Sequence, residues 1–110
     1  LAADGDALYF PTSDGAVVSL SPRDGTERWR LDLLARRGLS APAIDGDAVV
    51  VADFQGFLHW LDRGSGELLA RAATDGKRVS NRPVSAGGLV LVQTDAGSVH
   101  AFRARPRAAR

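Results

Sequence analysis

The stretch Asp45–Glu67 (DGDAVVVADFQGFLHWLDRGSGE) decides the fold of this chain. It holds two short runs of apolar, β-branched and aromatic residues, Ala48–Ala52 and Phe57–Leu61, each as long as a typical β-strand. Turn-forming residues separate the runs and flank them: Asp45-Gly46-Asp47, Gln55-Gly56 and Gly64-Ser65-Gly66. The stretch therefore predicts a β-hairpin with a further turn at each end.

The same unit occurs again on both sides of this stretch, at a fixed interval of 41 residues. Five sets of landmarks keep the interval: Gly5, Gly46 and Gly87; Gly15, Gly56 and Gly97; Leu20, Leu61 and Phe102; Gly25 and Gly66; Pro42 and Pro83. Because independent positions rarely coincide in this way by chance, the chain is predicted to be a tandem array of one structural unit.

The flanking units are predicted to repeat the strands of the central one. The expected strands are Ala7–Phe10, Ala16–Leu20 and Thr26–Leu31, then Ala41–Ile44, Ala48–Ala52, Phe57–Leu61 and Glu67–Ala73, then Pro83–Ser85, Leu89–Gln93 and Ser98–Phe102. Asp14-Gly15 predicts a two-residue hairpin of type I′, in which both central residues need a positive φ. Longer connections, Asp32–Ser40 and Thr74–Asn81, join one unit to the next.

Four strands in a unit of this length predict an all-β chain, a β-propeller fragment of about 2.7 four-stranded antiparallel blades. A β-sandwich is the alternative, but it does not require so strict a period. The unbroken Val49-Val50-Val51 agrees with a strand that neighbouring blades cover on both faces. Because 2.7 blades are too few to close a ring, the chain is expected to be an arc of a larger propeller. The expected divisions are 1-31 (incomplete blade), 41-73 (complete blade), 82-103 (blade lacking its outer strand) and 104-110 (basic tail).

Composition and charge narrow the possible functions. No apolar run approaches the roughly 18 residues of a membrane-spanning helix. The absence of cysteine excludes disulfides and thiolate metal sites. The net charge of +1 includes a basic tail with four arginines, so the remainder carries 10 basic and 13 acidic residues. A nucleic-acid-binding domain usually shows a basic face on its folded part, so no nucleic-acid partner is predicted.

Two segments carry a pattern that belongs to a known class of propeller. In LSPRDGTERW (20–29) and LDRGSGEL (61–68), an aspartate and a nearby glycine precede an outer strand, which in the first unit ends in Trp29. This pattern resembles the repeats of the PQQ-like propeller superfamily, which implies that Trp29 docks between blades. The second unit departs from the pattern, because Ala70 stands at the position equivalent to Trp29.

A closer resemblance covers Trp29 to Phe102, about two-thirds of the chain. The runs DLLARRGLSAP (32–42), VVVADFQGFLHWLDRGSGELLAR (49–71) and RPVSAGGLVLVQTDAGSVHAF (82–102) resemble the C-terminal blades of the BamB family. Members of that family are propeller lipoproteins of the machinery that assembles outer-membrane β-barrels. In such rings the last blade takes its outermost strand from the N-terminus, which implies a natural C-terminus and a truncated N-terminus here.

The resemblance implies a function, a location and partners. The expected function is that of a non-enzymatic scaffold subunit that assists assembly and insertion of β-barrel proteins, at the periplasmic face of the outer membrane. The expected partners are the periplasmic domains of the barrel-assembly protein and unfolded outer-membrane proteins. The membrane would be reached only through an N-terminal lipid anchor absent from this chain.

Two other classes within the superfamily stay open as alternatives. One is a fragment of a PQQ-dependent dehydrogenase propeller, which would need a vicinal cysteine pair over the cofactor, and this chain has no cysteine. The other is a PQQ-like sensor domain, and upstream sequence would separate all three classes.

Two histidines, His59 and His100, occupy the same position of neighbouring units. They could form a metal or acid–base pair, but packed sheets lie about 10 Å apart, too far for two imidazoles to share an ion. The alternative is that histidine fills a repeat position packed between blades. The Asp-Gly-Asp turns lack the full set of oxygen ligands of a calcium loop. No catalytic residue, cofactor or metal site is therefore predicted.

The connection Asp32–Ser40 holds the candidate partner-binding residues. It combines three leucines with two arginines. Such a mixture is enriched at interface hot spots, and arginine is the most enriched of these residues. The equivalent connection, Thr74–Asn81, has only Val79 as a large apolar residue. Four of these residues are predicted to form a partner surface on the full ring: Leu33, Leu34, Arg36 and Arg37. The alternative is that the leucines fold back and seal the edge of the blade.

Overall fold

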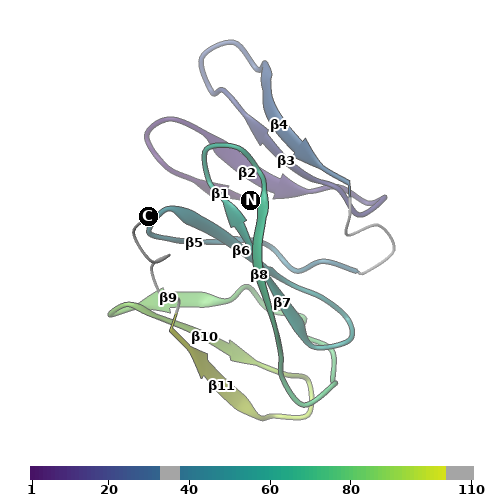
Figure 1. Ribbon diagram of the computed structural model, residues 1–110. Coiled ribbons are helices and arrows are strands. Elements are labelled where there is room, and N and C mark those ends of the chain that lie inside the picture. Colours follow the sequence, from purple (N-terminus) through teal and green to yellow (C-terminus); the bar gives the residue numbers. More distant parts are fainter. Residues whose placement is uncertain (33–37, 104–110) are drawn as a thin grey trace.

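A computed structural model describes residues 1–32 and 38–103 as three antiparallel sheets stacked into an arc (Figure 1). The first sheet contains β1 (Ala2–Ala3), β2 (Leu8–Pro11), β3 (Val17–Leu20) and β4 (Glu27–Leu31). The second sheet contains β5 (Ala43–Asp45), β6 (Ala48–Ala52), β7 (Phe57–Asp62) and β8 (Leu68–Ala73). The third sheet contains β9 (Val84–Ala86), β10 (Leu89–Gln93) and β11 (Val99–Phe102).

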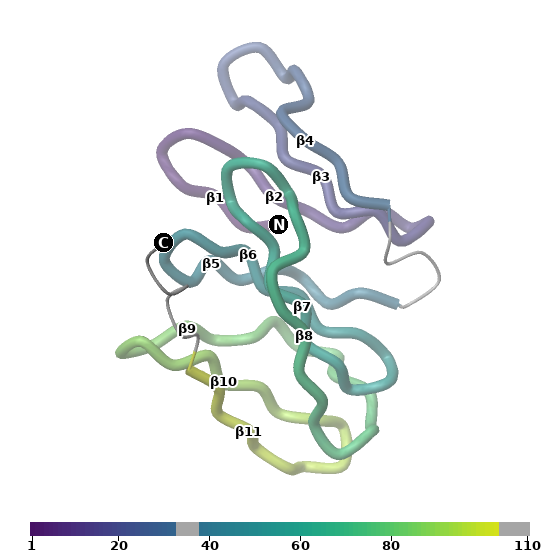
Figure 2. Tube along the Cα trace, viewed as in Figure 1, coloured from purple at the N-terminus to yellow at the C-terminus, as the bar shows by residue number. Residues whose placement is uncertain are grey.

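Within each sheet the strands follow one another in chain order, each antiparallel to the one before it. The chain then passes to the next sheet and repeats the pattern, as the colour order of Figure 2 shows. The predicted all-β propeller arc with its 41-residue repeat is confirmed. The division into 1-31, 41-73, 82-103 and a 104-110 tail stays a prediction. None of the described residues belongs to a helix that is long and apolar enough to cross a membrane.

The hairpin tips differ from the predicted type I′ turn. At the first tip the Thr12 amide donates to the Ala16 carbonyl at 2.8 Å and the Gly15 amide to the Thr12 carbonyl at 3.1 Å. These bonds close a loop of three residues rather than two, so the prediction is wrong at this point. A three-residue loop places a glycine in the left-handed region at its last position, which Gly15 occupies with φ 93°. The second and third tips close in the same way.

The core lies between the sheets as two separate clusters. Val49, Val51 and Leu61 face the first sheet, where they pack with Tyr9, Val17 and Trp29. Val50, Leu58 and Trp60 face the third sheet, where they pack with Val90 and Val92. Strand β6 is therefore covered on both faces, and its three valines are fully buried. This confirms the interpretation of the unbroken valine run.

One indole serves each of the two joints between sheets, but it comes from different strands. In the first sheet Ser19 of β3 pairs across the strands with Trp29 of β4. In the second sheet the equivalent pair is Trp60 of β7 with Ala70 of β8. Trp29 is buried between the first two sheets, as the resemblance implied, and its Nε1 donates to the Arg63 carbonyl at 2.8 Å. The departure at Ala70 is thus matched by an indole on the neighbouring strand.

Candidate functional site

The candidate site lies on the rim of the arc formed by the hairpin tips, here called the tip rim. It comprises the tips at 12–16, 53–57 and 94–98 and the described parts of the two connections, 38–40 and 74–82. These described parts lie on this rim because the outer strands end there and the next inner strands start there. Direct bonds join connections to tips: the Val79 amide donates to the Asp53 carbonyl at 3.3 Å, and the Asp95 amide to the Arg78 carbonyl at 2.8 Å.

The predicted partner residues belong to the connection between the first and second sheets. Leu33, Leu34, Arg36 and Arg37 lie outside the described residues. The third leucine of the connection, Leu39, is described, and it is partly buried against the core cluster between the first and second sheets.

The second tip is braced from inside by Asp53. Its Oδ1 accepts the amides of Gln55 at 2.9 Å and Phe57 at 3.0 Å, and its Oδ2 lies 2.8 Å from His59 Nε2. Both side chains are fully buried. The Asp53 carboxyl group holds the backbone of the turn through two hydrogen bonds, and the His59 imidazole holds the carboxyl group in position.

The other two tips have different supports. At the position of Asp53 they carry Thr12 and Thr94, whose single hydroxyl replaces the two carboxyl oxygens. His100, the counterpart of His59, stacks on Phe102 with ring centroids 6.5 Å apart. His59 and His100 thus have different surroundings. Among residues 1–32 and 38–103, no three His, Cys, Asp or Glu side chains form a group that could hold a metal ion.

The second tip is also tied to the connection that follows β8. Thr74 Oγ1 donates to the Gly56 carbonyl at 2.7 Å, and the Thr74 amide donates to the same carbonyl at 3.1 Å. The fit is close, because a Cβ added to Gly56 would lie 2.6 Å from the carbonyl oxygen of Lys77. The tip and this connection therefore hold each other in place.

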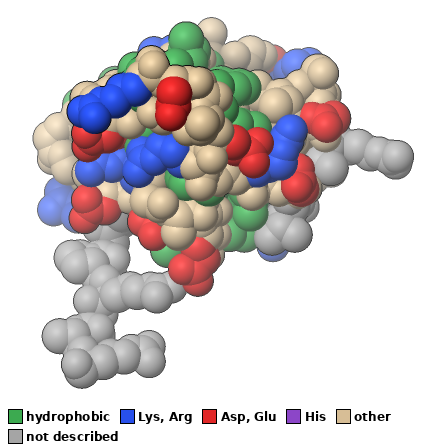
Figure 3. Space-filling view, turned by 90° about the horizontal axis from the view of Figure 1, so that it is seen from above, with side chains coloured by type: hydrophobic (Ala, Val, Ile, Leu, Met, Phe, Trp, Pro, Cys, Tyr) green, Lys and Arg blue, Asp and Glu red, His purple; other side chains and the backbone are tan. Residues whose placement is uncertain are grey.

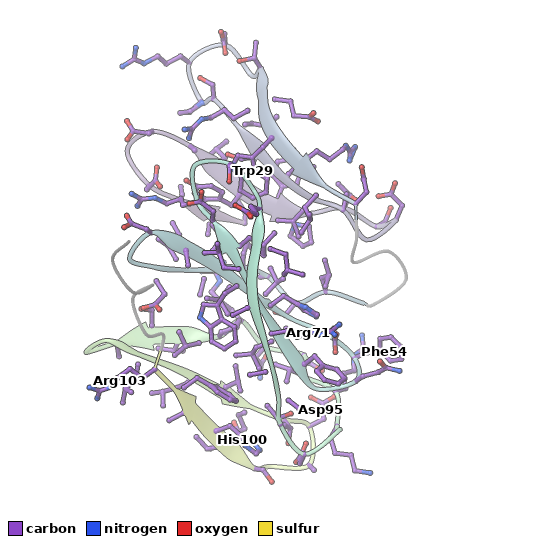
Figure 4. The ribbon with its side chains drawn as sticks, viewed as in Figure 1. Trp29, Phe54, Arg71, Asp95, His100 and Arg103 are labelled. Atoms are coloured by element: carbon purple, nitrogen blue, oxygen red, sulfur yellow. The ribbon has the colours of Figure 1, made fainter. Side chains whose placement is uncertain are left out.

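The braced tip displays Phe54, which sequence analysis missed. Its side chain is 43% exposed, and it projects from the edge of the molecule (Figure 4). The equivalent positions of the other two tips carry Ser13 and Asp95. A large aromatic at a position where the other repeats place a polar turn residue was the available signal.

The opposite rim carries a charged cluster between the first two sheets. Arg63 Nη1 lies 3.5 Å from Asp4 Oδ2, and Arg63 Nη2 lies 3.8 Å from Asp47 Oδ1. Tyr9 donates its hydroxyl to Asp4 Oδ2 at 2.9 Å. Burial, followed by the bond to Asp4, raises the pKa of Tyr9 to about 12. Burial acts to raise the pKa of Asp4, but bonds from the Asp6 amide, the Tyr9 hydroxyl and the Ala7 amide outweigh it and lower that pKa.

This cluster lines a polar hollow of about 330 Å³, together with Asp6, Arg28, Asp62 and Gly64. The Arg63 guanidinium forms ion pairs with carboxylates of two different turns, one of which belongs to the first sheet. Arg63 therefore links the first and second sheets. On the face seen in Figure 3, acidic and basic side chains are interspersed rather than gathered by sign. The cluster is therefore a joint between the first two sheets, and the candidate site is the tip rim.

Three stacked four- or three-stranded meanders, with an indole docked between the first two, define an arc of a β-propeller of the PQQ-like repeat class. The sequence model of one family, described as "Outer membrane protein assembly factor BamB", matches residues 13–107. The chain belongs to the BamB family.

Curated relatives and solved structures agree with this assignment. The chain is 38% identical over 104 residues to the outer membrane protein assembly factor BamB of Burkholderia pseudomallei, covering 94% of this chain and 27% of that protein. It is 40% identical over 89 residues to the BamB of Xanthomonas campestris, covering 81% of this chain and 22% of that protein. The chain thus spans about a quarter of the length of the curated relatives it matches.

The crystal structure of BamB from Moraxella catarrhalis superposes with a TM-score of 0.83 at 28% identity, covering 92% of this chain and 30% of that one. A quinohemoprotein alcohol dehydrogenase from Pseudomonas putida HK5 superposes with a TM-score of 0.77, covering 94% of this chain and 18% of that one. Its identity is 20%, so this second likeness concerns the fold alone.

Proposed function

We propose that this chain is part of a non-enzymatic scaffold subunit that assists the assembly and insertion of β-barrel proteins into the outer membrane. The observation that carries the proposal is the family match over residues 13–107. The name of the curated relatives, outer membrane protein assembly factor, supports the same process. The proposed location is the periplasmic face of the outer membrane, and no cofactor is required for the proposed function.

The proposed partner is the barrel-assembly protein of the outer membrane, contacted through its periplasmic domains. Unfolded outer-membrane proteins are a second proposed partner class. The proposed contact surface consists of Leu33, Leu34, Arg36 and Arg37, in the connection between the first and second sheets. Support comes from the chemistry of these side chains and from the rim to which their connection leads, since loops on a rigid scaffold commonly carry binding residues.

The test uses the full-length protein as its gene encodes it. The variant is the double charge reversal Arg36→Glu with Arg37→Glu, and the measurement is co-purification with the barrel-assembly protein. A matched control is Lys77→Glu with Arg78→Glu, because these residues stand at the equivalent positions of the next connection. The control separates the effect of one particular loop from the general effect of four units of added negative charge.

We expect the first variant to lose most of the co-purified partner while the control retains it. If both variants retain the partner with an unchanged fold, the connection only seals the blade edge and the proposed surface is wrong. If the unmodified protein recovers no barrel-assembly protein, the proposed function itself is wrong.

A further inference from the structure

We propose that the strand that completes the third sheet carries an aromatic side chain, of the size of tryptophan, directly opposite Ala101 of β11. The family resemblance implies that the last sheet is closed by a strand from the N-terminal part of the full-length protein. The proposal adds the side chain that this strand brings. It concerns the closure of the ring and does not depend on the function proposed above.

The outer edge of the third sheet is open among the residues that the structure describes. β11 pairs with β10 on one side and with no described strand on the other (Figure 1). In the first two sheets that side holds a fourth strand, β4 or β8. A cavity of about 900 Å³ reaches from β8 to the end of β11, and its lining includes Trp60, Leu69, Ala70 and Phe102. An open strand edge is a template for a further strand, and this edge has space for one.

Residues at equivalent positions of the sheets form a row that crosses all the strands of one sheet. In the first sheet the paired residues are Ala2, Tyr9, Ser19 and Trp29, and in the second sheet they are Ala43, Val50, Trp60 and Ala70. Each row faces the following sheet. Tyr9 and Trp29 belong to the core between the first and second sheets, whereas Val50 and Trp60 belong to the core between the second and third sheets.

Each complete row holds one indole, and the residue directly across from the indole is small. Trp29 on a fourth strand pairs with Ser19, whereas Trp60 on a third strand pairs with Ala70. Both indoles are buried, at 7% and 5% exposure. A packed joint tolerates neither two large rings in the space of one nor a void in its place. A small residue on the third strand therefore goes together with an indole on the fourth.

The row of the third sheet is incomplete, and its described members include no aromatic residue. They are Val84, Leu91 and Ala101, which pair across β9, β10 and β11. Ala101 stands at the third-strand position and is small, as Ser19 is in the first sheet. Val84 is 55% exposed and Ala101 is also exposed, so this face has room for a large side chain. The open fourth position therefore corresponds to that of Trp29, and an aromatic residue there would fill the joint to the next blade of the ring.

The first experiment identifies the residue opposite Ala101 in the full-length protein. Ala101→Cys is combined with single cysteines placed one at a time along the N-terminal segment, and disulfide formation is measured after mild oxidation. A disulfide needs Cβ atoms that lie about 4 Å apart, so the fastest pair marks the opposing position. We expect the unmodified protein to hold tryptophan, tyrosine or phenylalanine there. Val84→Cys is the matched control, because it lies in the same row but two strands from the edge, and it should form no disulfide with this segment.

The second experiment is a double-mutant cycle. Ala101→Trp places an indole on the third strand, as in the second sheet, where it should collide with the opposing aromatic residue. Replacing that aromatic residue by alanine should leave a void. Each single change should lower the melting temperature of the full-length protein by about 3 °C or more, and the two changes together should restore most of the loss. Val99→Trp, on the same face of β11 but outside the row, should show no such recovery with the same alanine.

A small or polar residue opposite Ala101, or losses that simply add in the cycle, would overturn the proposal. If no cysteine along the N-terminal segment pairs with position 101 of the folded protein, the completing strand has another source and the assigned occupant is wrong. If a variant of the cycle does not fold, the disulfide scan still identifies the opposing residue and decides the matter. None of these results involves the barrel-assembly protein, so the proposed function stands or falls separately.

Discussion

The joint between the first two sheets depends on a glycine that leaves room for an indole. A Cβ added to Gly66 would lie 2.4 Å from Cε3 and 2.6 Å from Cδ2 of Trp29. Gly66 also has φ 77°, a value that L-amino acids rarely adopt. Gly25 is the equivalent glycine one repeat earlier, with φ 73° and no atom within 4 Å of an added Cβ. Gly66→Ala and Gly25→Ala therefore share the backbone strain and differ in the contact with Trp29.

The difference between the two variants can be estimated from these distances. Alanine in the left-handed region costs about 1–2 kcal/mol, partly offset by the smaller entropy of its unfolded chain, so Gly25→Ala should cost roughly 1 kcal/mol. Carbon atoms in contact prefer about 3.5–4.0 Å, so Gly66→Ala must push the Trp29 indole away by about 1 Å. Complete removal of a buried tryptophan costs about 3–5 kcal/mol, and the bond from its Nε1 adds about 1 kcal/mol. If Gly66→Ala loses part of these contributions, it should lower the free energy of unfolding by about 3 kcal/mol.

The assay is urea unfolding of the full-length protein, with the free energies of the two variants compared under the same conditions. A double-mutant cycle supplies the control: in a Trp29→Ala background, Gly66→Ala should cost no more than Gly25→Ala, because the obstructing ring is gone. If the two glycine variants differ by less than about 0.5 kcal/mol in the unmodified background, the indole does not depend on Gly66 and the account of this joint is wrong.

Two further predictions concern other buried aromatic residues. Trp60 is 5% exposed and lies in the core between the second and third sheets. Trp60→Ala should therefore lower the free energy of unfolding by about 3–5 kcal/mol. A loss below about 1 kcal/mol in urea unfolding would contradict the place of Trp60 in that core. The pKa of Tyr9 is raised to about 12 from an ordinary 10. The stability that its neutral hydroxyl contributes is therefore fully present below pH 10 and is lost as the pH rises through 12. Alkaline unfolding should therefore depend less on pH over that range in Tyr9→Phe, and identical profiles for the two proteins would refute the linkage.

Sequence alone located the strands because glycine spacing fixes where the chain turns. The landmarks at Gly46 and Gly56 bracket β6, and their counterparts bracket β2 and β10 in the same way. The valine run at 49–51 indicated a strand that is covered on both faces, because a strand with one face in water would have alternated apolar and polar residues. The same information could not set the loop length at the tips, since one glycine serves both a two-residue and a three-residue turn.

The joint between the first two sheets and the candidate site were less predictable, because their contacts join residues that no sequence rule pairs. Trp29 bonds the carbonyl of Arg63 across 34 residues, and any residue type supplies that carbonyl. Asp53 is only six residues from His59, yet the interval carries no known signature, and the turn hides the partnership. The partner-surface prediction at 33–34 and 36–37 lies outside the described residues and stays a prediction. Phe54 needed a comparison of the same position in all three repeats rather than a search for motifs.

The exchange of an indole between the Ser19–Trp29 and Trp60–Ala70 pairs restricts how blades of this kind can be recombined. A chimaera that joined β3 of the first sheet to β8 of the second would hold serine opposite alanine and leave the joint without an indole. The reciprocal chimaera would place two indoles in the space of one, and both overfilling and emptying a packed interior are unfavourable. Third and fourth strands must therefore be inherited together, and crossover points for blade shuffling belong at the hairpin tips or at the connections between sheets.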